Sequence, residues 1–233
     1  MTEFKGRHVL ITGASRGVGF QACRQFLQAG AEVIGVARDP ERLAKAAKEL
    51  QALGRFTPVA ADLELDHAAL FIASAVAKQW QSLDLLVNNA GAQVWKGGWD
   101  QEGPDALGKL LQVNVVAPHQ LIMALLPLLK KGQEPRVINV SSGAGSFKAL
   151  QAGSGGPGYA LSKYSLNGLT LLWAAELKGV VAVNSLDPGW LKTDMGGPQA
   201  PGEPEDGARR MLALAGQPFA VSGKFHHEQA QDF

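Results

Sequence analysis

This sequence of 233 residues has little cysteine, little tyrosine and almost no excess of charge. Its single cysteine, Cys23, can form no disulfide within the chain, which fits a reducing compartment. Basic and acidic side chains number 22 and 21, so bulk charge gives no reason to expect a nucleic-acid or membrane partner. The most apolar run, Leu121–Leu129, is broken by Pro127 and is far shorter than the ~20 residues that span a bilayer.

The amino-terminal residues also lack a secretory signal, because Glu3 is an early acid and only five strand-like residues follow. With 46% hydrophobic and 18% charged residues, the composition is that of a globular chain and excludes disorder over most of its length. We therefore expect a soluble, cytoplasmic protein with one domain over residues 1–233.

Short apolar runs alternate with longer segments of helical spacing along the whole chain. The runs expected as buried strands are 8–12, 33–37, 57–60, 83–87, 136–141 and 180–185. The segments expected as helices are 17–29, 40–53, 68–79, 107–129 and 159–177, with Asp39 and Pro40 as the start signal of the second. This alternation predicts an α/β fold: a doubly wound, Rossmann-type parallel sheet of about seven strands with helices on both faces.

The first expected strand ends in a glycine-rich turn, Thr12-Gly13-Ala14-Ser15-Arg16-Gly17-Val18-Gly19, and a helical pattern follows at once. Glycines allow a sharp turn and a close approach of backbone N–H groups to a pyrophosphate at a helix N-terminus. A P-loop would need Gly-Lys-Ser/Thr, but Phe20 follows Gly19. A glycine-rich turn that binds no ligand remains the alternative.

The spacing Thr-Gly-x3-Gly-x-Gly resembles the short-chain dehydrogenase/reductase family, and further motifs occur in that family's order over roughly residues 5–226. They are Asn88-Asn89-Ala90-Gly91, Asn114, Ile138-Asn139-Val140-Ser141-Ser142, Tyr159-Ala160-Leu161-Ser162-Lys163 and Asp187-Pro188-Gly189. The segment that begins at Pro188-Gly189-Trp190-Leu191 and the late Gly223-Lys224-Phe225 look like the carbonyl-reductase branch. The whole set of motifs indicates this family far more specifically than any single motif does.

Tyr159 and Lys163 are four residues apart and therefore neighbours on one helix face. A phenol with an ordinary pKa of about 10 is a poor proton shuttle at neutral pH, and a nearby ammonium is expected to lower that pKa. The chain's other tyrosine, Tyr164, has Gly168 four residues on. A solvated pair on the helix surface is the alternative for Tyr159 and Lys163.

Ser142 stands at the end of a strand, where its hydroxyl can stabilise charge that develops on a carbonyl oxygen. By the pleat, either Ser141 or Ser142 faces the site, and the family's pattern implies Ser142. Asn114 alone would more often be a kink or a buried hydrogen-bonding residue. The resemblance implies that it holds a water linked through Lys163 to solvent, which completes the catalytic set Asn114, Ser142, Tyr159 and Lys163.

The resemblance also implies the cofactor contacts. They are Gly13, Ser15, Arg16, Gly17, Val18, Gly19, Arg38, Asp62, Leu63, Asn89, Ala90, Gly91, Tyr159, Lys163, Pro188, Gly189, Leu191 and Thr193. Asp62 and Leu63 would contact the adenine, although a strand-end cap is an alternative. Thr193 would bind the cofactor's phosphate or carboxamide, and residues 193–215 would form a substrate lid.

The basic residues near the expected ribose site favour NADP(H) over NAD(H). An acid at the end of the second strand would hold the ribose hydroxyls of NAD, but here Arg38 follows Ala37. Arg38 and Arg16 can both bind a 2′-phosphate. Asp39 is the competing signal, and its place before Pro40 fits a helix cap. Alternatively, Arg38 is solvated and Arg16 pairs elsewhere.

These features predict an NADP(H)-dependent oxidoreductase that interconverts a small-molecule carbonyl compound, ketone or aldehyde, and its alcohol. A catalytically silent NADP(H)-binding sensor or scaffold is the main alternative, although it would need no proton relay. A sugar-nucleotide epimerase or dehydratase is a third, but it has a differently spaced glycine motif. Residues expected to line a substrate pocket are Gln93, Val94, Trp95, Trp99, Phe147 and Trp190.

Two further expectations concern assembly and metals. Monomeric members of the carbonyl-reductase branch carry a long insertion before the tyrosine, whereas only 16 residues separate Ser142 from Tyr159. We expect a homodimer or homotetramer, paired through the apolar helix 159–177. No metal is expected, because His226 and His227 lack the spacing of metal ligands and are expected to lie in an exposed tail. The other histidines are expected to be structural, and Cys23 is expected to pack in the core.

Overall fold

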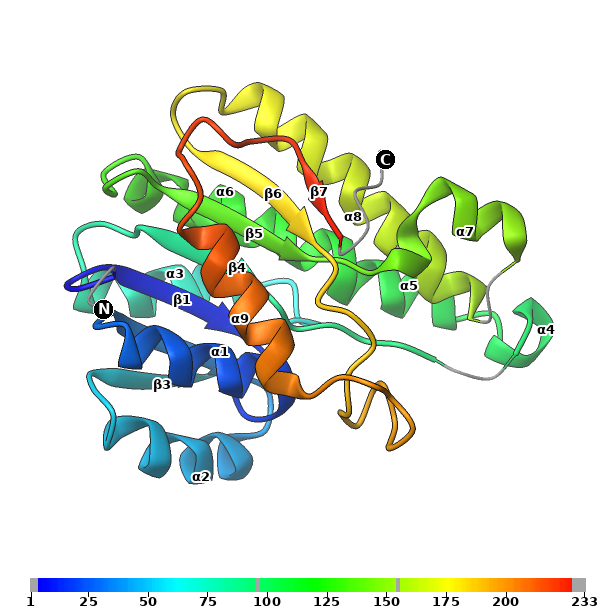
Figure 1. Cartoon of the computed structure of the whole chain (residues 1–233), viewed down its shortest axis with the longest axis horizontal. Helices are drawn as coiled ribbons and strands as arrows, with labels where there is room; N and C mark the ends of the chain where they lie inside the picture. The colour runs from blue at the N-terminus through cyan, green and yellow to red at the C-terminus, as the bar shows by residue number, and fades with distance from the viewer. Residues whose placement is uncertain (1–3, 95–96, 154–155, 228–233) are drawn as a thin grey trace.

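The computed structural model describes residues 4–94, 97–153 and 156–227, and its described part is built on one seven-stranded sheet (Figure 1). The strands are β1 (His8–Thr12), β2 (Glu32–Ala37), β3 (Phe56–Ala60), β4 (Leu85–Asn88), β5 (Arg136–Val140), β6 (Ala182–Leu186) and β7 (Phe225–His226). Their order is β3-β2-β1-β4-β5-β6-β7, and every pair is parallel. The predicted doubly wound parallel sheet is confirmed.

The chain order reverses between β1 and β4, which is the switch point where open parallel sheets bind ligands. The helical elements are α1 (Gly17–Gln28), α2 (Pro40–Gln51), α3 (Ala68–Gln79), α4 (Trp99–Glu102), α5 (Ala106–Leu111), the π-helical turn η1 (Gln112–Val116), α6 (Ala117–Leu129), the 3₁₀ turn η2 (Gly143–Gly145), α7 (Phe147–Ala152), α8 (Pro157–Glu176) and α9 (Pro204–Ala215). Asp39 caps α2 as predicted, since its carboxylate accepts the N–H groups of Glu41 and Arg42, both at 3.0 Å.

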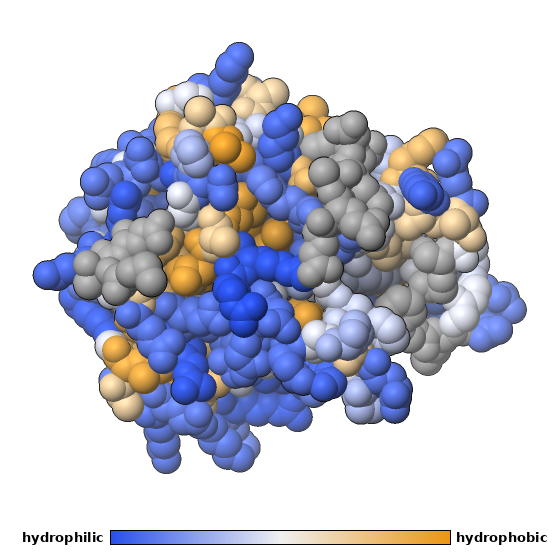
Figure 2. Space-filling model, in the orientation of Figure 1, coloured by the Kyte–Doolittle hydropathy of each residue, from blue (hydrophilic) through white to orange (hydrophobic). Residues whose placement is uncertain are grey.

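Two hydrophobic cores lie on the two faces of the sheet, because successive strand residues point to opposite sides. Val9 and Ile11 of β1 pack with α1, α2 and α9, whereas Leu10 between them packs with α3, α6 and α8. Cys23 is buried in the first core, as expected. Over this core, the outer surface of α1, α2 and α9 is largely hydrophilic (Figure 2). The two cores hold the strand ends in fixed positions relative to one another.

The helical run before β5 agrees with the expected helix over 107–129, although its apolar part is longer than the run Leu121–Leu129. Pro127 lies inside α6 and does not end it, and the helical run extends over Ala106–Leu129. In the described part of the chain, this is the one helix long and apolar enough to cross a membrane by length and composition. However, 44% of its apolar window is buried in the protein, and α6 packs on the sheet beside α3, as the core helix of a globular protein does.

The expected lid over residues 193–215 stays a prediction, and its second half is α9, which packs against α1 through Ala208 and Met211 in the first core. The expectation that His226 and His227 form an exposed tail is wrong. Phe225 and His226 form β7 beside β6, and the described chain ends at His227 next to the carboxyl edge of the sheet (Figure 1).

Candidate active site

The turn after β1 is tied to the turn after β4 by the Thr12 side chain. Its hydroxyl oxygen accepts the backbone N–H groups of Asn89 and Ala90, both at 3.0 Å, and the Asn89 side-chain amide donates to the Thr12 carbonyl at 2.8 Å. Thr12 was not among the predicted site residues. Its position, at the end of a strand and directly before the glycine turn, could have identified Thr12 as a site residue.

The glycines of this turn leave no room for larger residues. A Cβ at Gly19 would lie 2.2 Å from the Gly13 carbonyl oxygen and 2.4 Å from the Asn89 amide nitrogen. Gly13 and Gly17 have φ values of +73° and +55°, which L side chains rarely adopt. Backbone N–H groups are therefore accessible at the start of α1, and this cradle fits the pyrophosphate of a dinucleotide.

The segment after β6 lies over the same turn. The Thr193 methyl group lies 3.3 Å from the position of a Cβ on Gly17, and the Thr193 hydroxyl accepts the N–H of Gly196 at 3.0 Å. Pro188 and Leu191 pack against Gly207 of α9, which also contacts Val18 of α1. The predicted contacts from both ends of the chain thus gather at one edge of the sheet.

Asn114 sits in the π-helical turn η1 and is fully engaged by its neighbours. Its side chain exchanges two hydrogen bonds of 2.8 Å with the backbone of Ala92 and donates a third, of 2.9 Å, to the Ser162 hydroxyl. A Cβ on Gly91 would lie 3.4 Å from the Asn114 oxygen and 3.5 Å from Lys163 Nζ. Asn114 therefore fixes the backbone beside Lys163.

Helix α8 brings Tyr159 and Lys163 next to the end of β5. Both are buried, at 7% and 3% exposed, and Lys163 Nζ lies 5.7 Å from the centre of the Tyr159 ring. Tyr159 is hydrogen-bonded to the side chain of Ser142. Ser141 instead donates to the Lys163 carbonyl at 3.4 Å. Of the two adjacent serines, Ser142 is the one that meets the tyrosine.

The expectation that Lys163 lowers the pKa of Tyr159 is wrong. Burial raises the pKa of Tyr159 to about 12, which the Ser142 hydrogen bond only partly offsets and the charge of Asp187 increases. Burial also lowers the pKa of Lys163 to about 8, against the opposite effect of Asp187. The physical reason is that burial is the largest cause of both pKa shifts, and the Lys163 ammonium donates to the Val140 carbonyl at 2.8 Å.

Both arginines of the expected ribose site are paired with acids. Arg16 forms an ion pair with Asp194, and Arg38 forms one with Glu64 at 3.0 Å, with side chains at least 44% exposed in each pair. Such exposed pairs contribute little free energy and can open when a phosphate competes. Asp62 accepts the N–H of Glu64 at 3.1 Å, as a strand-end cap does.

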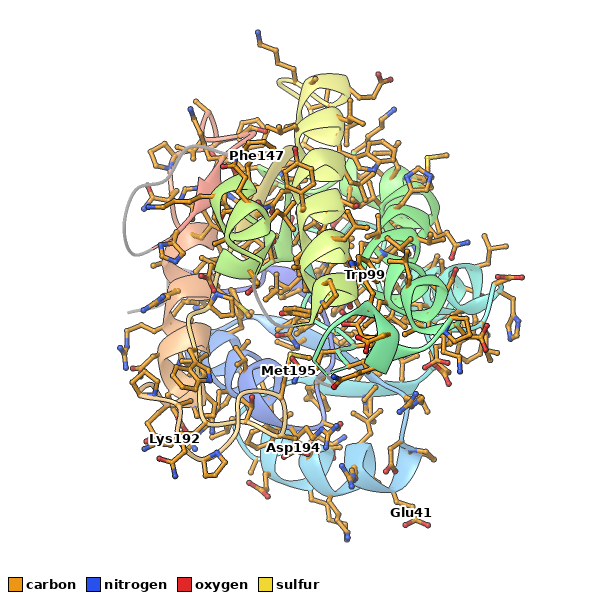
Figure 3. The ribbon with its side chains drawn as sticks, turned by 90° about the vertical axis from the view of Figure 1, so that its right-hand side faces the viewer. Glu41, Trp99, Phe147, Lys192, Asp194 and Met195 are labelled. Carbon is orange, nitrogen blue, oxygen red and sulfur yellow. The ribbon has the colours of Figure 1, made fainter. Side chains whose placement is uncertain are left out.

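The residues expected around a substrate lie at the same edge but are spread along it. Figure 3 shows Met195 near its middle, with Phe147 and Trp99 to either side of α8. The Gln93 amide donates to the Met195 carbonyl at 2.7 Å, which ties the two walls of the site together. Trp99, Phe147 and Trp190 are each more than half exposed. Trp95 lies outside the described residues.

Sequence reasoning missed two buried carboxylates near the tyrosine. Glu102 of α4 accepts the Gly158 N–H at 3.1 Å and so satisfies the first turn of α8, one residue before Tyr159. Asp187 follows β6, is 7% exposed, and accepts the N–H groups of Gly143 and Gly189, both at 2.9 Å. Asp187 is part of the motif Asp187-Pro188-Gly189 and could have been identified from it, whereas nothing in the sequence linked Glu102 to α8.

These elements define a doubly wound α/β protein, in which a glycine turn lies at the switch point of the parallel sheet and Ser142, Tyr159 and Lys163 lie at the same edge. The chain belongs to the short-chain dehydrogenase family, whose sequence model matches residues 7–204. It is 35% identical over 252 aligned residues to the "Rhamnolipids biosynthesis 3-oxoacyl-[acyl-carrier-protein] reductase" of Pseudomonas aeruginosa, covering 95% of this chain and 96% of that protein.

Solved structures of similar proteins agree with this assignment. The "RhlG/NADP active-site complex" of Pseudomonas aeruginosa has a TM-score of 0.87 at 33% identity, covering 96% of this chain and 95% of that one. The "NADPH bound carbonyl reductase from chicken fatty liver" has a TM-score of 0.87 at 29% identity, covering 95% of this chain and 96% of that one. The protein is therefore a short-chain oxidoreductase by family and fold.

Proposed function

We propose that this protein uses NADP(H) to interconvert a ketone or aldehyde and its alcohol, with Tyr159 as the proton donor in reduction. The observation that carries the proposal is the hydrogen bond between Ser142 and buried Tyr159, next to Lys163. The experiment is steady-state NADPH oxidation by the purified protein over a panel of ketones, aldehydes and quinones. A 3-oxoacyl thioester belongs in the panel because one relative's name specifies that class.

The bound nicotinamide would supply the hydride, and the chain's own residues would handle the carbonyl oxygen. Ser142 would polarise that oxygen by donating a hydrogen bond as negative charge develops on it. Burial raises the pKa of Tyr159 to about 12, so the phenol keeps its proton at neutral pH and would release it only to a stronger base, the alkoxide that develops on the substrate. Lys163, with a pKa of about 8, would then resupply the proton, while Asn114 keeps the adjoining backbone in place.

The same edge of the sheet would bind the cofactor. Gly13, Gly17 and Gly19 provide the backbone cradle for its pyrophosphate, with Ser15 and Val18 in the same turn. Asp62 and Leu63 would contact the adenine, and Asn89, Ala90 and Gly91 would line the site below. Pro188, Gly189, Leu191 and Thr193 would close it from the segment after β6. Two similar solved structures, one a complex with NADP and the other bound to NADPH, support this cofactor.

Replacing Arg38 with alanine is expected to weaken NADPH binding about tenfold or more and to leave NADH binding nearly unchanged, since a charge-assisted hydrogen bond contributes roughly 1.5–3 kcal/mol. Fluorescence titration of both cofactors measures this. The matched control is Arg42→Ala, which removes an exposed arginine paired with Asp39 on α2. Equal KM and kcat for NADPH and NADH in the unmodified protein would show that the arginines do not select the cofactor.

A catalytically silent NADP(H)-binding sensor is the second candidate function. It would bind NADPH through the same glycine turn, but no carbonyl compound would cause it to oxidise the cofactor. The completeness of the cluster favours an enzyme, since a sensor has no use for a serine held against a buried tyrosine. NADPH binding without turnover across the whole panel would favour the sensor.

The described surface of α8 supports the expectation of a homo-oligomer. Tyr164, Leu171 and Leu172 are exposed along this helix, and Leu172 is 71% exposed. We expect a dimer or tetramer by light scattering at micromolar concentration, and Leu172→Lys should shift it towards the monomer. The control is Leu70→Lys on α3, where Leu70 is 69% exposed. A monomeric mass for the unmodified protein would contradict the expectation.

A further inference from the structure

Strand β7 brings a histidine to a buried carboxylate that the reaction above does not use. His227 Nε2 lies 3.0 Å from Asp187 Oδ2, and the side chains are 23% and 9% exposed. The backbone supports the approach, because the N–H of Asp187 donates to the His226 carbonyl at 2.9 Å. Since a carboxylate only accepts, the nitrogen that faces it carries the hydrogen.

The same carboxylate oxygen reaches the proposed catalytic cluster. Asp187 Oδ2 accepts the N–H of Gly143 at 2.9 Å, and Gly143 directly follows Ser142 in the chain. A Cβ on Gly143 would lie 3.0 Å from Asp187 Oδ2 and 3.3 Å from His227 Nε2, so these three groups are in contact with one another. Asp187 Oδ1 accepts the N–H of Gly189 at 2.9 Å. One side chain therefore joins the Ser142 turn to the start of the segment after β6.

The position of Ser142 depends on that turn. Ser142 is the N-cap of the short turn η2, where its side chain accepts the Ala144 N–H at 3.2 Å, and it is hydrogen-bonded to Tyr159. A three-residue turn has few hydrogen bonds of its own, so an anchor on Gly143 fixes the direction of the serine. An oriented carboxylate needs partners on both oxygens, and His227 supplies a side-chain donor to the oxygen that holds Gly143.

We infer that His227 is a positioning residue, which holds the Asp187 carboxylate on the Gly143 amide and thereby keeps Ser142 directed at Tyr159. The effect on rate rests on the proposed carbonyl reduction, whereas the contact between His227 and Asp187 does not depend on that proposal. In this role His227 acts through the Asp187 carboxylate. Its loss should therefore lower the rate of the chemical step and leave substrate and cofactor binding nearly unchanged.

The test compares His227→Leu with His227→Gln, because glutamine keeps an N–H donor and leucine does not. We expect His227→Leu to lower kcat on the order of tenfold, with KM for NADPH and the carbonyl substrate nearly unchanged, since a small misplacement of a catalytic group is costly. His227→Gln should restore most of kcat. His67→Leu, at an exposed histidine before α3, is the matched control. A normal kcat in His227→Leu, or a loss that glutamine does not relieve, would overturn the inference.

A second measurement separates this inference from the proposed function. The amide proton of Gly143, observed by NMR in the full-length protein, should shift and exchange faster in His227→Leu but not in His227→Gln. If the unmodified protein reduces no compound of the panel, the proposed function fails, and the Gly143 resonance still decides whether His227 holds the carboxylate. An unchanged Gly143 resonance in His227→Leu would contradict the positioning role whatever the activity.

Discussion

Tyr159→Phe is expected to lower kcat by about 10²–10⁴-fold, the range that a positioned general acid contributes. The substitution removes one hydroxyl and keeps the ring, which is 7% exposed, so the fold and the cofactor cradle should be unaffected. Steady-state NADPH oxidation with a substrate found in the panel gives kcat, and fluorescence titration gives the NADPH affinity, which should stay within about twofold.

Tyr164→Phe is the matched control for this variant. It is the same substitution at the chain's other tyrosine, which lies on the same helix, is 40% exposed and contacts the Phe147 ring. We expect its kcat to be close to that of the unmodified protein. A near-normal kcat in Tyr159→Phe would remove Tyr159 from the mechanism.

Lys163→Met should reduce both turnover and NADPH affinity, because the ammonium is proposed to resupply the proton and is one of the expected cofactor contacts. It should also change how stability depends on pH. Burial lowers the pKa of Lys163 from 10.5 to about 8, so below pH 8 the folded protein carries a buried ammonium at a cost that the unfolded chain does not bear. As pH rises from about 8 to 10.5, the folded state loses this proton first and the cost disappears.

The expected size of this effect follows from the two pKa values. The difference between 10.5 and about 8 corresponds to roughly 3 kcal/mol. The free energy of unfolding of the unmodified protein should therefore rise by up to this amount relative to Lys163→Met between pH 8 and 10.5. Urea unfolding of both proteins at several pH values measures the difference.

The difference in unfolding free energy between the two proteins does not contain the contributions of other groups that titrate at alkaline pH. Burial raises the pKa of Cys23 and of Tyr159, and both groups oppose the rise by destabilising the fold as pH increases above their ordinary values. Both residues are present in the two proteins, so their contributions cancel. Parallel stability curves over this pH range would mean that Lys163 bears no such desolvation cost.

The sequence predicted the parts of the fold that depend on local patterns. Buried strands and amphipathic helices have distinct periodicities, and a glycine turn after a strand has few alternatives, so the sheet and the first turn followed directly. The expected helix over 107–129 corresponds to α5, η1 and α6 together, and the π-helical turn at Asn114 could not be foreseen. An extra residue in a helical turn shifts the apolar spacing by a single position, which one sequence does not distinguish from the ordinary variation of that spacing.

What the sequence could not predict depends on contacts between distant segments. His227 and Asp187 are 40 residues apart, and only the pairing of β7 with β6 brings them together. The packing of α9 could not be predicted either, because the burial of Ala208 and Met211 depends on the face that α1 presents. The pKa of Tyr159 was predicted in the wrong direction because desolvation is a property of the fold and not of the helical spacing.

The most direct test of carbonyl reduction is the transfer of deuterium from NADPH that carries deuterium at both positions of the nicotinamide C4. The purified protein is incubated with the labelled cofactor and each compound of the panel, and the products are analysed by mass spectrometry. We expect the unmodified protein to form at least one alcohol that carries a single deuterium on the former carbonyl carbon, and Tyr159→Phe to form almost none. Binding of NADPH with no deuterated alcohol from any compound of the panel would contradict the proposal.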